Sequence, residues 1–290
     1  MLQHNPALRG ILLMFIALGV FTLMDTIGKY LSRWYPVPGI VWARYAINLL
    51  MLLAFLAWRG ELRLMRTARP AIQVARGVLL GLATVIFFTA LSHMPLAEAS
   101  AIAFVLPLFV AVLAVPMLGE RLEAPRLVAI FVGLIGVLVV MRPGTEAFTV
   151  YALFPLAMAL VNALYQILTR KVAGVEPALT SLFYGSLVGA VMFTPVLPFA
   201  WLTPHDPFHW ALLVVLGLLA TVGHFILIRA FECAPASLLA PFVYTQLLWT
   251  ILAGYLVFGD LPDRWALAGM AIIVASGLYL ASRQRLTVKK

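Results

Sequence analysis

Charged residues are scarce in this chain of 290 residues. Asp, Glu, Lys and Arg together make up 11% of it, whereas hydrophobic residues make up 64%. Soluble globular domains carry roughly 25% charged residues, and no stretch here is long and polar enough to form a soluble domain. The mean hydropathy of +1.04 therefore predicts an integral membrane protein that lies almost entirely within the bilayer.

Residues and motifs that support metal, redox or hydrolytic chemistry are also rare. The single cysteine, Cys233, excludes an intramolecular disulfide and a thiolate metal cluster. His205 and His209 flank a proline in a predicted loop without a third strong ligand nearby, so we expect no metal. The chain has no His-Glu-x-x-His, Gly-x-Ser-x-Gly or nucleotide-binding motif. We therefore expect no enzyme activity, no cofactor and no transport driven by ATP.

Acidic residues number 11 against 20 basic residues, which gives a formal net charge of +9. In a soluble protein this excess would suggest a nucleic-acid partner. Here 15 of the 20 basic residues fall on the N-terminal side of the predicted membrane, four fall on the other side, and Arg44 lies inside a helix. Such a bias predicts that both termini are cytoplasmic, with a secondary attraction to anionic membrane lipid and no nucleic-acid partner.

Ten apolar segments of transmembrane length account for most of the chain. Proline and glycine mark most boundaries, and six of the seven tryptophans fall near predicted helix ends, where interfacial tryptophans belong. The predicted spans are 8–32, 37–58, 71–92, 96–118, 124–141, 149–171, 177–198, 209–231, 236–258 and 264–282. Pro107 and Pro241 interrupt the fourth and ninth spans, as hinges or as simple kinks.

The second half of the chain repeats the first at an offset of 140 residues. The motif Ala90-Leu-Ser-His-Met-Pro95 returns as Ala230-Phe-Glu-Cys-Ala-Pro235, and Leu118-Gly119-Glu120 returns as Phe258-Gly259-Asp260. Internal repeats of this kind are typical of secondary transporters.

Each half holds five predicted helices. Because five is an odd number, the second half must enter the membrane from the opposite side. We therefore expect two inverted five-helix repeats, residues 1–145 and 146–290, within one transmembrane domain. In such folds the substrate site lies near the membrane midplane, where the repeats meet.

A polar stripe in the first span also returns at the offset of 140. Both stripes have i, i+3, i+4, i+7 spacing, which places their side chains on one helix face. Their members are Thr22, Asp25, Thr26 and Lys29 in the first half, and Asn162, Tyr165, Gln166 and Thr169 in the second. Polar side chains within a bilayer are costly unless they face a protein interior or water. The stripes therefore indicate one polar pathway built from two halves.

Several motifs resemble those of the drug/metabolite transporter superfamily, specifically its EamA-type ten-helix carriers. They are Trp42-Ala-Arg44-Tyr45, Phe88-Thr-Ala-Leu91 with Met94-Pro95, Leu106-Pro107, Leu118-Gly119-Glu120-Arg121-Leu122 and Gly133-Leu-Ile-Gly136-Val137. The second half is a looser copy, in which Asp260 stands where the family usually has Glu. The resemblance implies a carrier in the bacterial inner membrane, with a central cavity among helices one to four and six to nine and with helices five and ten at the periphery.

Two interpretations remain open for the charged residues of the first half. Asp25 and Lys29, four residues apart with the acid first, either form an ion pair or serve a zwitterionic solute or proton coupling. Arg44, with Asn48 one turn deeper, either pairs with Asp25 and holds the fold or binds a substrate carboxylate through two hydrogen bonds.

The remaining candidates are uncharged or titrate near neutral pH. They either bind a moving solute or bond neighbouring helices. His224 could also relay protons, and Trp249, halfway along its span, could stack on a planar solute. These candidate substrate-binding residues are Thr84, Asn162, Tyr165, Gln166, His224, Tyr244, Gln246 and Trp249.

The sequence as a whole favours a secondary transporter of small metabolites that works by alternating access. Relatives implied by the resemblance move amino acids, including aromatic ones, often outward, so we expect an amino-acid exporter. The alternative is an uptake carrier for a vitamin or a nucleoside-like metabolite. An intramembrane enzyme and a structural protein fit the polar stripes less well.

Overall fold

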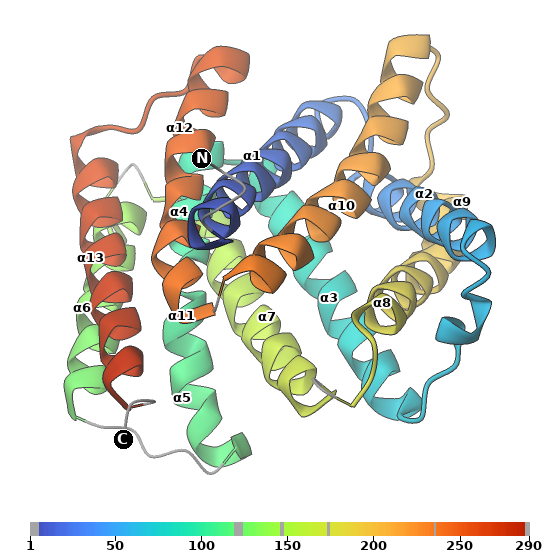
Figure 1. Ribbon diagram of the computed structural model, residues 1–290. Coiled ribbons are helices and arrows are strands. Elements are labelled where there is room, and N and C mark those ends of the chain that lie inside the picture. Colours follow the sequence, from blue (N-terminus) through green and yellow to red (C-terminus); the bar gives the residue numbers. More distant parts are fainter. Residues whose placement is uncertain (1–5, 119–123, 146–147, 173–174, 235, 288–290) are drawn as a thin grey trace.

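The computed structural model describes residues 6–118, 124–145, 148–172, 175–234 and 236–287. All regular elements within these ranges are helices (Figure 1). Seven of the described helical segments are long and apolar enough to cross a membrane, and three shorter apolar helices accompany them: Leu127–Met141, Phe242–Phe258 and Arg264–Tyr279. Gly119, Glu120 and Pro235 of the repeated motifs, with Arg121 and Leu122, lie outside the described residues.

The helices follow the predicted spans closely. Prolines begin several of them, since the first turn of a helix needs no backbone N–H donor at that position. The first half contains α1 (Pro6–Leu31), α2 (Val37–Trp58), η2 (Leu62–Met65), α3 (Pro70–Leu91), α4 (Leu96–Ala103), α5 (Leu106–Leu118) and α6 (Ala124–Met141). The second contains η3 (Val150–Ala152), α7 (Leu153–Val172), α8 (Ala178–Phe193), η4 (Thr194–Val196), α9 (Leu197–Ala200), α10 (Pro207–Cys233), α11 (Ala236–Leu239), η5 (Ala240–Thr245), α12 (Gln246–Ala253), η6 (Gly254–Phe258) and α13 (Arg264–Thr287).

Two of the predicted spans are broken near their middles. The span 96–118 divides into α4 and α5 at a turn over Phe104 and Val105, just before Pro107. The span 236–258 divides into α11 and α12, joined by the 3-10 helix η5 that contains Pro241. Proline lacks the N–H that would continue an α-helix, which explains both positions. Broken helices at membrane depth are tolerated where they are buried in protein or line a cavity.

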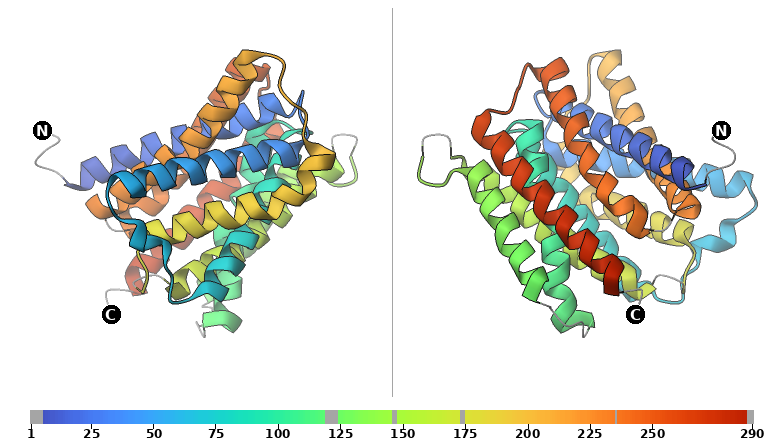
Figure 2. Two further views of the ribbon diagram at one scale, coloured as in Figure 1. Left: turned by 90° about the vertical axis from the view of Figure 1, so that its right-hand side faces the viewer. Right: turned by 60° about the vertical axis from the view of Figure 1, so that its left-hand side comes forward.

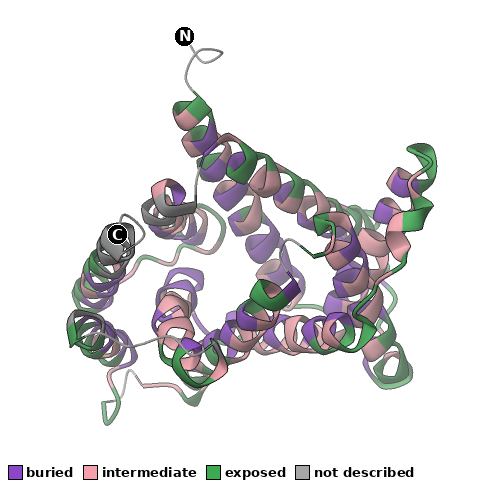
Figure 3. Ribbon diagram, turned by 60° about the horizontal axis from the view of Figure 1, so that its bottom comes forward, coloured by how far each residue is buried: buried purple, intermediate pink, exposed green. Residues whose placement is uncertain are grey.

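Helices from the two halves pack against one another throughout the molecule. α1 crosses α10, α2 packs on α8 and α10, and α3 packs on α7 and α8 (Figures 1 and 2). Figure 3 shows that buried residues face the interior while exposed ones gather on outer faces. Many of the exposed side chains are large and apolar, among them Leu50 (65% exposed) and Phe131 (66%). An apolar outer surface suits contact with lipid, which is as apolar as leucine.

The helices α6 and α13 pair side by side at one edge of the molecule (Figure 1). Their backbones are in contact, because a Cβ atom added at Gly269 would lie 2.7 Å from the carbonyl oxygen of Gly136. Close approach through small residues is a common mode of helix packing in membranes. The pair occupies the periphery, which is the place that the family resemblance implies for helices five and ten.

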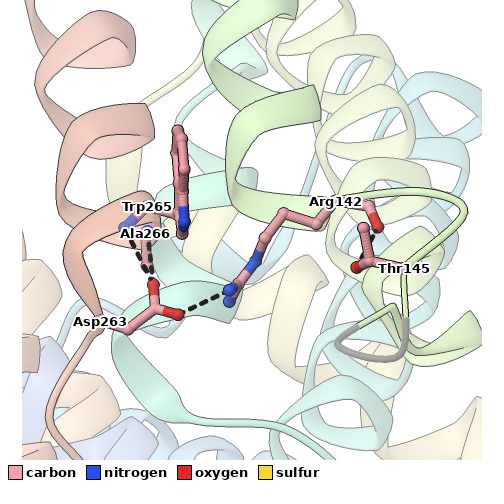
Figure 4. Close-up of polar contacts among 5 residues, drawn as sticks. All are labelled: Arg142, Thr145, Asp263, Trp265 and Ala266. Carbon is pink, nitrogen blue, oxygen red and sulfur yellow. Dashed lines mark hydrogen bonds and ion pairs between the residues drawn. The ribbon is translucent and has the colours of Figure 1, made fainter.

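Asp263 fixes the turn that precedes α13 (Figure 4). Its Oδ1 accepts hydrogen bonds from the backbone N–H groups of Ala266 (2.8 Å) and Trp265 (3.1 Å), which caps the helix. Its Oδ2 forms an ion pair with Arg142 at the end of α6. The hydrogen bond from Ala266, with those from Arg142 and Trp265, holds the pKa of the Asp263 carboxyl below its usual range. These contacts tie α6 and α13 together at one end.

Candidate functional site

Two adjoining cavities lie among the helices. The first, here called the central cavity, measures about 300 Å³. It is lined by α1, α2, α3, α4, α7 and α10 and by the segments at the breaks in both interrupted spans. The second cavity measures about 440 Å³ and lies between α2, α3, α7, α8 and α10. Both are bordered by Arg44, Leu80 and His224, so the two cavities meet at these side chains.

Opposite charges from two helices line the central cavity. Asp25 of α1 and Arg44 of α2 both line this cavity and are both buried, at 7% and 8% exposure. Arg44 donates a long hydrogen bond of 3.3 Å to Oγ1 of Thr84, while its Nε has no partner. Oγ of Ser100, which also lines the cavity, has no partner either. Buried polar atoms are nearly always satisfied, so these two atoms are candidates to hydrogen-bond a solute that enters the cavity.

Aromatic rings form much of the remaining wall. Phe21, Phe87, Phe88 and Phe104 all line the central cavity. The Arg44 guanidinium also lies 5.8 Å from the centre of the Phe88 ring, which steadies the cation without neutralising it. An apolar wall with a few convergent polar groups is typical of a site for a small organic molecule.

Four of the uncharged candidates also line the central cavity: Thr84, Asn162, His224 and Gln246. Nδ1 of His224 lies 2.7 Å from the carbonyl oxygen of Ala220. Because a carbonyl only accepts, the hydrogen-bonded nitrogen of a neutral imidazole carries the proton, and Nε2 remains as an acceptor. Asn162 makes only a long contact of 3.9 Å with the sulfur of Met158. The amide and imidazole groups are therefore available to hydrogen-bond a solute.

The second cavity is more polar than sequence reasoning suggested. It contains the expected Asn48 and Tyr165, and also Arg76, which is only 3% exposed. Asn48 accepts a hydrogen bond of 3.2 Å from Ser186 of α8. Sequence reasoning assigned Arg76 to the basic residues on the N-terminal side of the membrane, but the structure places it inside the bundle. Arg76 follows the proline that begins α3 by only six residues, so its position in the sequence does not distinguish it from the basic residues that flank the span.

Glu176 lies at the outer end of the second cavity, in the turn between α7 and α8. Burial favours a higher pKa for this carboxyl, but hydrogen bonds outweigh it. The donors are the hydroxyl of Thr67, the side-chain amide of Gln73, and the backbone N–H groups of Ala68 (2.8 Å) and Arg69 (3.1 Å). They hold the pKa of Glu176 below its usual range. The carboxylate thus joins the segment before α3 to the segment before α8.

Lys29 does not pair with Asp25 in the structure. Its Nζ donates a hydrogen bond to the carbonyl oxygen of Met94 and lies 4.0 Å from Oδ2 of Asp260. The ion-pair interpretation of Asp25 and Lys29 therefore does not hold, since Lys29 finds its anion in the turn before α13. Asp25 keeps no ion-pair partner within 4.0 Å among the described residues, which leaves its carboxyl for the cavity.

Three further candidates lie outside both cavities. Gln166 lines a separate outer groove with Val110 of α5. Tyr244 is buried, and its ring packs beside Gly277 and Phe104. Trp249 packs on Phe15, with ring centres 4.8 Å apart, and donates a 3.2 Å hydrogen bond to the carbonyl oxygen of that residue. The side chains of Tyr244 and Trp249 thus serve helix packing in this conformation, whereas Gln166 is exposed.

His209 of the loop motif also has a packing partner. Its Nδ1 lies 2.7 Å from the hydroxyl of Tyr35, which precedes α2. The ring is surrounded by those of Tyr30, Trp34 and Tyr35. The residue therefore helps to join the ends of α1 and α10. Among the described residues, no three His, Cys, Asp or Glu side chains gather as a metal site would require.

The sequence matches a family model and several proteins named as transporters. The model described as the EamA-like transporter family matches residues 8–142 and again residues 149–282. An S-adenosylmethionine uptake transporter of Rickettsia conorii is 32% identical, over 88% of this chain and 86% of that protein. The pseudopaline exporter CntI of Pseudomonas aeruginosa is 28% identical, over 95% of this chain and 97% of that protein. A riboflavin transporter of Brucella anthropi is 29% identical, over 84% of this chain and 88% of that protein.

The fold also has a counterpart among solved structures. One crystal structure superposes with a TM-score of 0.64 and 19% sequence identity, over 96% of this chain and 98% of that chain. At this identity the likeness concerns the fold alone. The family and the relatives named above are transporters rather than enzymes, so they support transport of metabolites by a multi-pass membrane protein.

Proposed function

Because this chain belongs to the EamA-like transporter family, we propose that it is a secondary transporter of a small zwitterionic metabolite, either an amino acid or an amino-acid conjugate. The single observation that carries the proposal is the presence of Asp25 and Arg44 in one cavity. A carboxylate of the solute would bind the Arg44 guanidinium, and its cationic group would bind Asp25. Ser100 and the free Nε of Arg44 supply hydrogen-bonding groups that lack partners.

The proposed mechanism is alternating access by two inverted five-helix repeats, residues 1–145 and 146–290. Three observations support this architecture. The family model matches once in each half. The three shorter apolar helices would complete ten spans with the seven long ones. The breaks over Phe104 and within η5 (Ala240–Thr245) are about 140 residues apart and lie beside the central cavity, as expected of discontinuous helices in transporters.

We place the protein in the bacterial inner membrane with both termini in the cytoplasm, because the basic residues concentrate on the N-terminal side. In this orientation the second cavity lies toward the cytoplasm, since Glu176 falls in a turn on that side. Asp25 is also our candidate for proton coupling, because it is buried and has no close ion-pair partner among the described side chains.

Export of amino acids remains our first choice of direction, in keeping with the exporter among the relatives. A second function, uptake of a vitamin or nucleoside-like metabolite, is favoured by a different observation. Four phenylalanine side chains line the central cavity, and aromatic walls suit a planar ring system. The relatives named for S-adenosylmethionine and riboflavin uptake or transport fit this alternative equally well.

Counterflow in proteoliposomes tests both candidates without knowledge of the driving ion. Vesicles loaded with one unlabelled solute receive a trace of the same labelled solute outside, and a carrier accumulates the label. The panel comprises phenylalanine, threonine, S-adenosylmethionine and riboflavin. Accumulation of phenylalanine or threonine that is lost in Arg44→Gln supports the proposal, and accumulation of S-adenosylmethionine or riboflavin without either amino acid supports the second function. If folded protein moves no member of the panel, the proposed function is wrong.

A further inference from the structure

Arg76 is a buried cation inside a membrane-spanning helix, yet its hydrogen-bond partners among the described residues are neutral. It is the seventh residue of α3, which places it roughly 9 Å along the helix axis at 1.5 Å per residue. Its Nε donates to Oγ1 of Thr169 (2.9 Å), and its two terminal nitrogens donate to Oε1 of Gln73 and, at 3.5 Å, to the hydroxyl of Tyr165. A charge that is buried without an anion is costly, so its position calls for a function.

The guanidinium retains donors for a further ligand. It has five N–H groups, and the three hydrogen bonds above use three of them. Two N–H groups are therefore left without a partner among the described residues. Arg44, which is 92% buried and whose Nε has no partner, borders the same second cavity. Two buried guanidinium groups thus line one cavity of about 440 Å³.

The acid that shares the second cavity with Arg76 is already engaged. Glu176 shares the second cavity, but its Oε1 accepts from Thr67, Ala68 and Arg69 and its Oε2 accepts from Gln73. Gln73 stands between the two charges, since it also accepts the hydrogen bond from Arg76. This chain of contacts orients the Arg76 guanidinium and leaves it without direct contact to a carboxylate.

We infer that the second cavity is an anion-binding subsite on the cytoplasmic limb of the pathway, in which Arg76 binds the carboxylate of a solute as it moves to or from Arg44. The planar guanidinium suits a carboxylate because it can donate two parallel hydrogen bonds. One part of the inference rests on the proposed function, namely that the bound anion is the carboxylate of the transported solute.

Equilibrium binding to the purified full-length protein in detergent tests the subsite without any need for transport. The probes are 3-phenylpropionate and 3-phenylpropanamide, which share one shape and differ in the carboxylate. A ligand that binds the folded protein raises its thermal midpoint, so titration of that midpoint yields the affinity. We expect Arg76→Gln to weaken binding of the acid about tenfold or more, and to leave binding of the amide unchanged.

Three variants separate the ligand role from other roles of the side chain. Arg76→Lys should restore part of the affinity for the acid, because the charge remains. Thr180→Val changes a buried residue of α8 that lines neither cavity, so its preference for the acid should match that of the wild type. Arg63→Gln, at an exposed position between α2 and α3, controls for the loss of one positive charge. Arg76→Met replaces the glutamine variant if that variant does not fold.

Two results would overturn the inference. One is an affinity for 3-phenylpropionate that does not change in Arg76→Gln. The other is an equal loss for the acid and the amide, which would assign Arg76 to helix packing alone. Failure of the proposed function is recognised separately, because it is measured by wild-type counterflow and not by these binding constants.

Discussion

One side chain holds the end of the molecule opposite the second cavity. Nζ of Lys29, at the end of α1, donates to the carbonyl oxygen of Met94 and lies 4.0 Å from Asp260 and 5.1 Å from the centre of the Phe258 ring. Gly259, with a φ of 74°, ends the helical run before Asp260 and allows this turn. Lys29 thereby connects α1 with two turns, one from each half of the chain. We predict that Lys29→Met favours opening at this end.

The expected magnitude follows from the contacts. A hydrogen bond from a charged donor to a buried acceptor contributes about 1.5–3 kcal/mol. The ion pair adds under about 1 kcal/mol, because its distance is 4.0 Å and the Asp260 side chain is 38% exposed. Removal of the buried ammonium also relieves its desolvation, which offsets part of the loss. A net change of about 2 kcal/mol would raise the ratio of open to closed molecules by about 30-fold.

Opening at this end can be measured by cysteine labelling, because one substitution removes the single native cysteine and leaves a background without thiols. In a Cys233→Ser background, Ser100→Cys places one thiol in the wall of the central cavity. A membrane-impermeant maleimide, added to the periplasmic face, labels this thiol only when that face opens. Labelling is slow when the open state is rare, and its rate is then proportional to the open fraction. We expect Lys29→Met to increase the labelling rate by about tenfold or more.

Arg264→Gln is the matched control, since Arg264 is an exposed cation on the same side of the membrane. Its labelling rate should equal that of the parent. Lys29→Arg keeps a cation that can reach Met94 and Asp260, so it should label slowly. An unchanged labelling rate in Lys29→Met, with the protein folded, would refute the assignment of Lys29 to closure of this end.

Three further predictions concern the site and the packing. Asp25→Asn should slow counterflow of zwitterions about tenfold or more, and should remove any pH dependence, without lowering the amount of folded protein; wild-type counterflow in the variant would contradict this. Gly269→Leu should destabilise the protein by about 1–3 kcal/mol through contact with Gly136, seen as a lower thermal midpoint than for the exposed control Ala268→Leu. Glu176→Ala should lower the midpoint by a few degrees at neutral pH. The folded-state pKa of Glu176 lies below its usual 4.5, so this stabilisation is complete above pH 4.5 and is lost as the pH falls through the folded-state pKa. A difference in thermal midpoint between wild type and variant that persists in acid would contradict the prediction.

The helices could be predicted because lipid imposes strong rules on composition. A span must be apolar over about 20 residues, so its ends are visible in the sequence as prolines, glycines and charges. The predicted span 37–58 coincides with α2, and 71–92 differs from α3 by one residue at each end. The breaks near Pro107 and Pro241 also follow from local chemistry, because proline cannot continue a helix.

The contacts between helices could not be predicted in the same way. Helical spacing placed Asp25 and Lys29 on one face and made them natural partners, yet Lys29 lies beyond the cavity and bonds Met94 and Asp260. Arg76 lies close enough to a predicted helix end to resemble a charge that sets topology. Only the packing of α7 and α8 around α3 identifies it as an interior residue. Partners that are distant in sequence are decided by tertiary packing, which hydropathy does not record.

The order of the buried charges suggests how a zwitterion could move at moderate cost. A carboxylate that leaves water on the cytoplasmic side would meet Arg76 in the second cavity and then Arg44, which borders both cavities. It would therefore exchange one guanidinium for another and would not cross an apolar barrier as an unpaired anion. Its cationic group would reach Asp25 only in the central cavity, after Arg44 is engaged. A solute that lacks the carboxylate would lose both steps, so we expect discrimination against it to arise along the whole pathway and not at one site.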